Sequence, residues 1–509
     1  MNTLANTRLH WLPVLLLVPI LVFATACDSG GSNGDNGSNG NDDGPTQADF
    51  DNRVTLIESN NEFTDPNLQG IDRGQNGNLN PTPSPNPLSP RARADFENTS
   101  ETVRDNYTGM GVDLSDINDA SYVGAFDPSA GSRWTKDWTK LSSHGYTSGS
   151  GSNSTTTTAN TQRVVTDDIS GSETWASDET IILDGLIFVE AGGSLEIKPG
   201  TVIKGRNDSD NNPSISTDEG ASALIVKQGG EITASGTASE PIIFTAEQDN
   251  LSDQSDLGPT DRGFWGGLIV LGEAPISEGT QVQIEGIPAS EDAEFGGASP
   301  DESSGTLEYI SIRHGGFSIS GVSGDEINGL TLGGIGSGTT VNHIEVFANG
   351  DDGIEWFGGK PHADHLVAAF CGDDSFDWDT GYRGTGQYWF AIQGSDDGNR
   401  AGELDGFDST TDENAEEFSD PVISNATFIG TGNSSGISSN GTTLRIRNGG
   451  AGEWYNSIFT DFPSTAVKVD LDDGANKRLE EGDIVLNNNV FFNYGDGNTL
   501  ADIMEDTES

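Results

Sequence analysis

The sequence has few cysteines, few cationic residues and no long amphipathic helical pattern. Its two cysteines, Cys27 and Cys371, allow at most one intrachain disulfide. Only 24 Lys and Arg oppose 81 Asp and Glu, which gives a net charge of −57 at pH 7. Such a surface repels phosphates, so the charge argues against a nucleic-acid partner. The 68 glycines and the excess of acidic residues argue against a helical bundle, because Gly and Asp are poor in helix interiors.

The first 45 residues predict an address outside the cytoplasm. Residues 1–27 combine a charged start, an apolar run and small residues before Cys27, and this resembles a bacterial lipoprotein signal peptide. The resemblance implies that Cys27 is lipidated, which would anchor the protein to a membrane; ordinary secretory cleavage near Ala26 is the alternative. Residues 28–45 consist largely of Gly, Ser, Asn and Asp and would form a flexible tether. We expect the outer membrane or the cell surface as the location, and the sequence does not indicate an oligomeric state.

The chain after the tether divides into two regions. Residues 46–165 are polar and irregular, with a helix expected over residues 91–107, and we interpret them as a partly helical cap segment. Trp134 and Trp138 in this segment are expected to cover the end of the following domain. Residues 166–509 contain short strand-like runs between Gly, Asn and Asp turns, without amphipathic helices between them, which argues against an α/β fold.

An internal repeat identifies the fold expected for residues 166–509. Residues 342–356 align with residues 364–378 at a constant offset of 22 residues, and His343 falls on His365. An earlier pair of segments aligns at a longer offset because one member carries an insertion. A period near 22 with β-type runs fits one coil of a parallel β-solenoid, whereas a β-sandwich requires no such repeat. The sequence therefore predicts an all-β fold, a right-handed parallel β-helix.

Several segments also resemble a known family. ILDGLIFVEAGGSLEIKPGTVIKG, RGFWGGLIVLGEAPI, LEYISIRHGG and NGDDGIEWFGG are similar to segments of a largely uncharacterised family of bacterial extracytoplasmic lipoproteins. The resemblance implies a β-helix of the pectate-lyase-like class over roughly residues 120–495. It implies no particular chemistry, because the family has no settled activity.

The repeat would stack acidic residues from consecutive coils about 4.8 Å apart. Like charges placed opposite each other on neighbouring strands destabilise a sheet, so these acids need an explanation. A bound hard cation such as Ca²⁺ is the first, shared protonation of a carboxyl pair is the second, and screening by high external salt is the third. A catalytic carboxylate pair is a further interpretation. The net charge makes adaptation to salt, as in halophilic proteins, a serious alternative. The predicted metal ligands are Asp351, Asp352, Glu355, Asp373, Asp374, Asp377 and Asp379.

The expected function is the binding of glycan or another surface polymer, with Ca²⁺ stabilising the stacked acids. The alternatives are a polysaccharide lyase or glycoside hydrolase that uses the same acids, and a purely structural envelope protein. For the enzyme, the catalytic candidates are Asp352, Asp374, Asp377 and Arg383. For either binding or catalysis, the aromatic residues expected to stack on sugar rings are Trp389, Tyr382 and Tyr388.

Overall fold

The computed structural model describes residues 61–93, 110–147, 159, 161–207, 221–317, 327–407, 417–433, 435, 437, 441–470, 475–499 and 504–506. Cys27, the predicted tether and most of the predicted helix at 91–107 lie outside these residues. Residues 45–509 form one compact unit, and the description below concerns that unit. No helix within the described residues is both long and apolar enough to cross a membrane.

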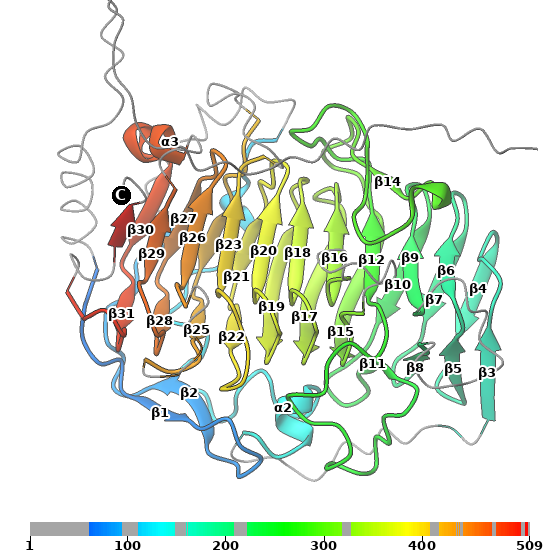
Figure 1. Cartoon of the computed structure of the whole chain (residues 1–509), viewed down its shortest axis with the longest axis horizontal. Coiled ribbons are helices and arrows are strands. Elements are labelled where there is room, and N and C mark those ends of the chain that lie inside the picture. Colours follow the sequence, from blue (N-terminus) through cyan, green and yellow to red (C-terminus); the bar gives the residue numbers. More distant parts are fainter. Residues whose placement is uncertain are drawn as a thin grey trace, which may run out of the picture. The chain divides into compact units, whose positions relative to one another are not determined.

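Short apolar strands stack in parallel from coil to coil (Figure 1). One wall is a ten-stranded sheet made of β6 (Leu186–Val189), β9 (Ala223–Val226), β12 (Leu268–Leu271), β16 (Leu330–Gly333), β18 (Ile354–Phe357), β20 (Phe376–Asp379), β23 (Gly402–Asp405), β26 (Leu444–Arg447), β29 (Val467–Val469) and β32 (Met504–Asp506). Each strand pairs with the strand one coil away, so the order in the sheet follows the order in the chain.

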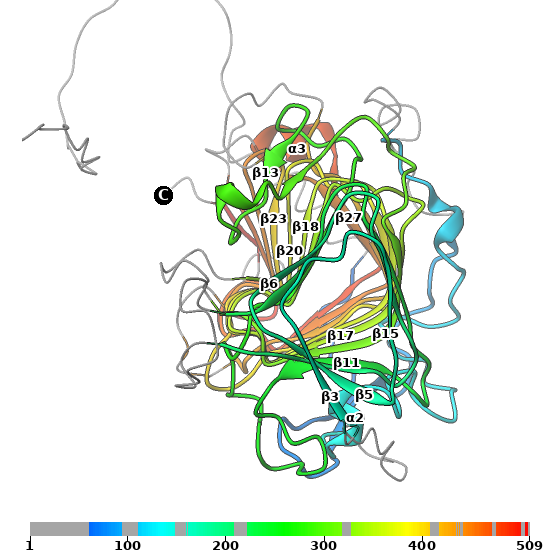
Figure 2. The same cartoon turned by 90° about the vertical axis from the view of Figure 1, so that its right-hand side faces the viewer.

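The other two walls belong to one large sheet of eighteen strands, which bends at a corner (Figure 2). It contains β3 (Thr161–Val165), β4 (Ser172–Trp175), β5 (Glu179–Leu183), β7 (Ser194–Ile197), β8 (Val202–Gly205), β10 (Glu231–Ser235), β11 (Ile242–Ala246), β15 (Gly305–Arg313), β17 (Thr340–Phe347), β19 (His362–Ala369), β21 (Thr385–Gln387), β22 (Phe390–Ile392), β24 (Val422–Ser424), β25 (Thr427–Ile429), β27 (Gly452–Tyr455), β28 (Ile458–Thr460), β30 (Ile484–Asn487) and β31 (Val490–Phe492). The three long strands β15, β17 and β19 cross the corner and therefore join its two halves.

The strand register confirms the repeat found in the sequence. Ile344 pairs with Leu366 between β17 and β19, and Trp356 pairs with Trp378 between β18 and β20, so the offset is 22 residues in both sheets. All pairings within these two sheets are parallel, which rules out the β-sandwich alternative for the described residues. The prediction of an all-β parallel β-helix is confirmed.

A column of left-handed backbone conformations marks the corner of the large sheet. Its seven members have φ between 50° and 62° and stack along one line: Tyr309, His343, His365, Tyr388, Asn425, Asn456 and Asn488. Aromatic rings stack at the first four positions, and asparagines occupy the last three. Asn488 Nδ2 donates a hydrogen bond to Asn456 Oδ1 at 2.8 Å. Asparagine tolerates this backbone conformation better than most residues, which explains its use at the corner.

The described part of the N-terminal segment runs along the outside of the large sheet, and we call residues 61–93 and 110–147 the strap. It carries the antiparallel pair β1 (Leu68–Ile71) and β2 (Leu79–Pro83), the 3₁₀ helix η3 (Leu114–Asp116) and the short helix α2 (Lys140–Ser143). At one end of the strap, Glu62 pairs in parallel with Val490 and Phe63 stacks on Phe491, so the strap covers the last coil.

The prediction for the two tryptophans of the strap is wrong. Trp134 and Trp138 pack edge-on against His343 in the middle of the β-helix, with ring centroids 6.0 and 5.7 Å away. They therefore cover the side of the coil rather than its end. No sequence pattern predicts this placement, because it depends on contacts between residues about 200 positions apart.

An excursion between β12 and β15 lies over the ten-stranded sheet. It contains the short hairpin of β13 (Val282–Gln283) and β14 (Glu294–Phe295) and the 3₁₀ helix η5 (Ala289–Glu291). Its apolar residues, among them Ile276, Ile284 and Phe295, pack on outward-facing apolar residues of the sheet such as Ile269. The excursion is thus held in place by burial of apolar surface. The remaining helix, α3 (Ala475–Glu481), precedes β30.

Candidate functional site: an acidic groove

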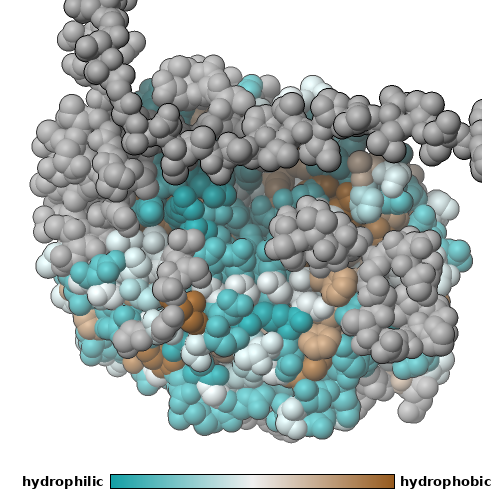
Figure 3. All heavy atoms as spheres, viewed as in Figure 1, coloured by the Kyte–Doolittle hydropathy of each residue, from teal (hydrophilic) through white to brown (hydrophobic). Residues whose placement is uncertain are grey.

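A groove of about 690 Å³ lies between the β13–β14 hairpin and the outer face of the ten-stranded sheet. Its acidic lining residues, which define the acidic groove, are Glu278, Glu285, Asp351, Asp352, Glu355, Asp373, Asp374, Asp377, Asp379, Glu403 and Asp405. Arg447 is the one basic residue among the described residues that line it. Figure 3 shows hydrophilic residues in a hollow over β20 and β23, with hydrophobic residues beside it toward β12 and β14.

Strand alternation places these acids on the outer face. Successive side chains of a strand point to opposite sides, so Trp378 of β20 enters the core while Asp377 and Asp379 face out. Glu355 on β18 pairs directly with Asp377, and Asp377 pairs with Glu403 on β23. Three carboxylates therefore form a column along the coils, one per coil.

A second acidic column precedes the strands. Asp352 Oδ1 accepts a hydrogen bond from the backbone amide of Asp374 at 2.8 Å, and Asp374 Oδ1 accepts one in turn from the backbone amide of Arg400. The turn is tight, because a Cβ on Gly353 would lie 2.4 Å from the carbonyl oxygen of Ser375. Glycine at this position therefore lets consecutive coils approach closely enough to align the two aspartates.

Two groups of three carboxylates converge around Asp352. One oxygen each from Asp351, Asp352 and Asp373 lie within 4.8 Å of one another, and the same holds for Asp352, Asp374 and Asp377. Asp352 belongs to both groups and is 7% exposed. Carboxylate oxygens at such separations are the ligands that hard divalent cations prefer.

Burial and mutual repulsion disfavour the charged forms of these acids. For Asp352, burial is the larger cause and the charge of Asp351 the next, and together they raise its pKa well above the ordinary value. Burial likewise raises the pKa of Glu355, with Glu285 as the next contributor, and the pKa of Asp377, with Glu355 as the next. A bound cation would remove this penalty by stabilising the ionised forms.

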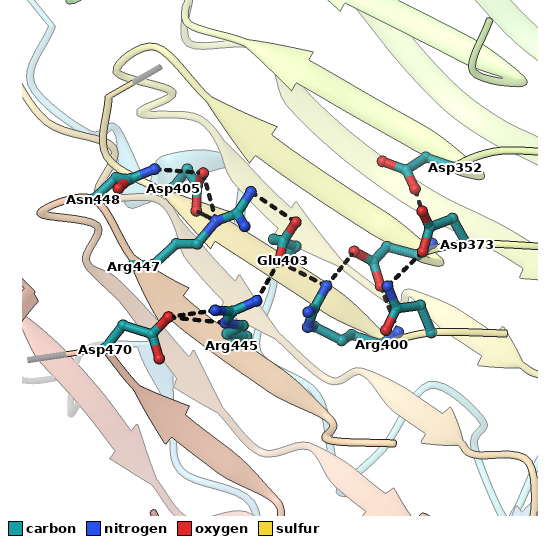
Figure 4. A network of polar contacts seen from close by, with 11 residues as sticks. Asp352, Asp373, Arg400, Glu403, Asp405, Arg445, Arg447, Asn448 and Asp470 are labelled. Atoms are coloured by element: carbon teal, nitrogen blue, oxygen red, sulfur yellow. Dashed lines mark hydrogen bonds and ion pairs between the residues drawn. The ribbon is translucent and has the colours of Figure 1, made fainter. Parts of the chain in front are cut away.

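Arginines neutralise the far end of the groove but not its centre (Figure 4). Arg400 Nη1 lies 3.3 Å from Asp374 and 2.6 Å from Glu403, and Arg447 bonds both Glu403 and Asp405. Burial raises the pKa of Asp405 to about 6, although Arg447 opposes the shift.

The acids at the centre of the groove have no such partner. Within the described chain, Asp352, Glu355 and Asp377 form no ion pair with a basic side chain. Glu355 accepts a hydrogen bond from Asn328, which carries no charge. The uncompensated negative charge is therefore concentrated at β18 and β20.

The structure brings all seven predicted metal ligands into the acidic groove. Asp351 lies beside Asp373, Asp352 beside Asp374 and Glu355 beside Asp377, as the 22-residue offset predicted. The catalytic candidates Asp352, Asp374 and Asp377 share the same cluster. Whether a cation occupies it or a reaction takes place there stays a prediction.

Four other predicted site residues do not line the groove. Trp389 and Tyr382 are fully buried in the core, where both stack on Trp356, so the prediction that they stack on sugar rings is wrong. Tyr388 lies at the corner of the large sheet against Tyr122 and His365. Arg383 is buried, and its Nε donates to the carbonyl of Phe418, so it is not placed to act as a base in the groove.

The sequence reasoning also missed several groove residues. Glu403 and Asp405 continue the acidic columns, but the coil between β20 and β23 is longer than 22 residues, so the fixed offset did not reach them. Arg400 follows Asp352 and Asp374 in the second acidic column, and no sequence pattern indicated this position. Glu278 and Glu285 come from the excursion, whose docking over the sheet follows from packing rather than from the repeat.

Comparison with known proteins agrees with this architecture. The profile of the family described as "pectate-lyase like beta helix domain" matches residues 167–508. No curated protein and no solved structure matches the chain.

Proposed function

Because this chain belongs to the family of pectate-lyase-like β-helix domains, we propose that it binds glycan or another surface polymer in the acidic groove, with Ca²⁺ bound at the stacked carboxylates. A domain of this family is consistent with a glycan-binding or polysaccharide-acting protein. The observation that carries the proposal is the position of Asp352, which is shared by two groups of converging carboxylates.

Three features of the groove support a cation site over screening by salt. The central acids lie in a cavity and are largely buried, so mobile ions screen them less than they screen exposed charges. Their oxygens converge from different coils, as a cation with six to eight oxygen ligands requires. Arginines neutralise other acids of the same groove, so the uncompensated negative charge is confined to its centre.

The groove also has the features of a polymer site. It runs beside an apolar wall of Val282, Phe295 and Phe357 and ends near Arg447 and Asn448. Polar groups for hydrogen bonds beside apolar surface are typical of ligand sites. The acidic field favours a neutral or cationic polymer, and a polyanion would need the cation as a bridge.

The proposed address is the cell envelope. Lipidation at Cys27 and the tether at residues 28–45 would hold the β-helix at a membrane, with the groove free to meet polymers outside the cell. Labelling with a lipid precursor and its loss in Cys27→Ala test the anchor independently of the groove.

Thermal unfolding with Ca²⁺ and with chelator, at constant ionic strength and at two NaCl concentrations, tests the cation site. We expect a Ca²⁺-specific rise in Tm that Asp352→Asn abolishes and that Asp178→Asn, an exposed acid outside the groove, leaves intact. A loss of stability that NaCl alone restores would show screening instead. Binding of a polysaccharide panel with and without Ca²⁺ then tests the ligand, and no binding in either condition would leave a purely structural role.

Catalysis on polysaccharide is the second candidate, and the spacing of the acids favours it. Oxygens of Asp352, Asp374 and Asp377 lie within 4.8 Å of one another, close to the separation of about 5 Å between the two carboxyl groups of retaining glycosidases. Their raised pKa values would suit a general acid. Assays for reducing ends and unsaturated products across the same panel test this, with Asp377→Asn as the inactive variant expected for an enzyme.

A further inference from the structure

All five described histidines lie where the strap meets the β-helix. His144 follows α2, His314 follows β15, His343 and His365 occupy the corner, and His362 begins β19. Tryptophans of the strap contact His343 and His365, and the Lys140 side chain contacts His314. None of these residues lines the acidic groove. Histidine is the residue whose charge changes most readily between pH 5 and 8, so their position needs an explanation.

The helix α2 is fixed by a buried polar network. The backbone amides of Lys140 and Leu141 donate to the Glu345 carboxylate at 2.6 and 3.1 Å, and Ser311 Oγ donates to the same carboxylate at 2.5 Å. Lys140 Nζ lies 2.6 Å from His314 Nε2. The side chains of Lys140, His314 and Glu345 are all buried.

The hydrogen bonds of His314 require a neutral ring. Its Nδ1 lies 2.5 Å from the backbone carbonyl oxygen of Asp261, which only accepts, so Nδ1 carries the proton. Nε2 must then accept from Lys140 Nζ. Protonation of Nε2 would place two donors against each other inside the protein, and the contact would be lost.

The charges around this site do not favour a second positive group. Lys140 faces Asp249, Arg313, Asp256 and Glu345, and burial is the main cause that lowers its pKa to about 8. The groups that face His314 are Lys140, Arg313 and the Asp261 carbonyl, and burial lowers its pKa well below the ordinary value.

His144 has a similar environment. It faces Arg313, Lys140, Asp249 and His314, and its pKa falls to about 2, mainly through burial. Its Nδ1 lies 2.9 Å from Ser143 Oγ, while its Nε2 is buried and has no hydrogen-bond partner among the residues that the structure describes. A proton on Nε2 would therefore find no acceptor in the closed structure.

His365 provides a contrast within the same interface. Its Nδ1 lies 3.1 Å from Asp364 Oδ1, so this ring nitrogen faces a carboxylate rather than an amine. Its backbone φ is 57°, close to the 61° of His314. The two residues share this backbone conformation but lie on different lines of the large sheet, and they differ in the charge of the group they face.

We propose that residues 134–147 of the strap form an acid-sensitive latch, which opens from the β-helix when His314 and His144 take up protons while the coils stay folded. Opening would uncover the stacked rings of Tyr309, His343 and His365, which Trp134 and Trp138 cover in the closed state. A histidine that is protonated only in the open state, with an ordinary pKa of about 6.5, increases the opening equilibrium about 30-fold between pH 7.5 and pH 5.

Hydrogen exchange of the full chain at pH 7.5 and pH 5, corrected for intrinsic rates, tests the latch. We expect residues 134–147 to lose protection at pH 5, by about 30-fold for each of His144 and His314, while β17, β19 and β22 keep theirs. Equal protection at both pH values, or a parallel loss in the strands, would overturn the proposal.

A matched pair of variants sharpens the test. His314→Asn should reduce the pH response by about 30-fold, whereas His365→Asn should leave it unchanged. Later coils carry asparagine at both equivalent positions: Asn493 on the line of His314, and Asn425, Asn456 and Asn488 on the line of His365. Lys140→Met is a second test of the same site. It frees His314 Nε2 to accept a proton in the closed state, so it should also reduce the pH response of hydrogen exchange. An unchanged response in both His314→Asn and Lys140→Met contradicts the latch.

Discussion

The acidic groove and the strap interface both bury titratable side chains, but they treat charge differently. In the groove, Asp352, Glu355 and Asp377 repel one another and have no cationic partner in the described chain. At the strap, Glu345 meets backbone amides and Lys140 meets a neutral histidine, so the donors and acceptors match. In our proposal an ion from outside compensates the first arrangement, whereas the protein's own groups satisfy Lys140 and Glu345 in the second. This difference separates the groove that we propose as a cation site from a contact that holds the fold.

The two regions should also respond to pH in opposite directions. The groove carboxyls have raised pKa values, so they hold protons more tightly in the folded state, and stability falls as pH rises above their ordinary values near 4. The strap histidines have lowered pKa values, so stability falls as pH drops below about 6.5. A single unfolding curve adds these effects, and variants are needed to separate them.

Removing Arg400, the buried cation that pairs with Asp374, should have the largest effect on stability. Arg400→Met removes the ion-pair partner of Asp374, whereas Glu403 keeps its ion pair with Arg447. Breaking a buried pair in this way costs about 3–5 kcal/mol of unfolding free energy. Denaturant unfolding of Ca²⁺-free protein measures it. Arg163→Met is the control, because its ion pair with Glu173 is partly exposed and should cost less than about 1 kcal/mol. Equal costs for the two variants would show that Arg400 compensates nothing.

Calcium should stabilise the groove and lose this effect in acid. At a free concentration 100 times Kd, one bound ion adds about 2.7 kcal/mol to the unfolding free energy. Carboxylate ligands must be ionised to bind, so we expect the gain to be smaller at pH 5 than at pH 7.5. Unfolding at both pH values with equal ionic strength measures the difference. A calcium effect that is independent of pH would place the ion away from the acids with raised pKa values.

Substitution of Lys140, the buried cation of the strap, should lower the unfolding free energy less than substitution of Arg400. Lys140→Met removes the hydrogen bond to His314, which costs about 1 kcal/mol, but it also removes a poorly solvated amine. We expect a loss of about 1 kcal/mol or less at pH 7.5, measured by denaturant unfolding. A loss as large as that of Arg400→Met would mean that the strap, too, depends on a buried charge.

The smallest effect should come from relieving repulsion on the sheet. Asp377→Asn places a neutral side chain between Glu355 and Glu403, and removal of like charges on adjacent strands should stabilise Ca²⁺-free protein by about 0.5–1 kcal/mol. The gain should be larger at pH 8 than at pH 5, because more of these carboxyls are ionised at pH 8. Destabilisation by this substitution at pH 8 would show that Asp377 already has a favourable partner.

The sequence predicted the repeat and the acidic stack because both depend on local periodicity. A fixed offset of 22 residues is enough to pair Asp352 with Asp374 and Glu355 with Asp377, and the strand register agrees. The prediction failed where the coil length changes, as it does before Glu403. Register, not composition, was therefore the informative signal.

Long-range packing could not be predicted in the same way. Trp389 and Tyr382 have the composition of a sugar-binding surface, but core packing against Trp356 takes both of them inside. The strap and the hairpin reach their places through apolar contacts between distant parts of the chain. Contacts of this kind leave no periodic trace in a single sequence.

Calorimetric titration of Ca²⁺ into chelator-treated protein at pH 7.5 tests the central claim most directly. The account predicts saturable binding in the unaltered protein, its loss in Asp352→Asn and its retention in Asp178→Asn. Absence of binding in the unaltered protein, or equal binding in both variants, would contradict a cation site at Asp352.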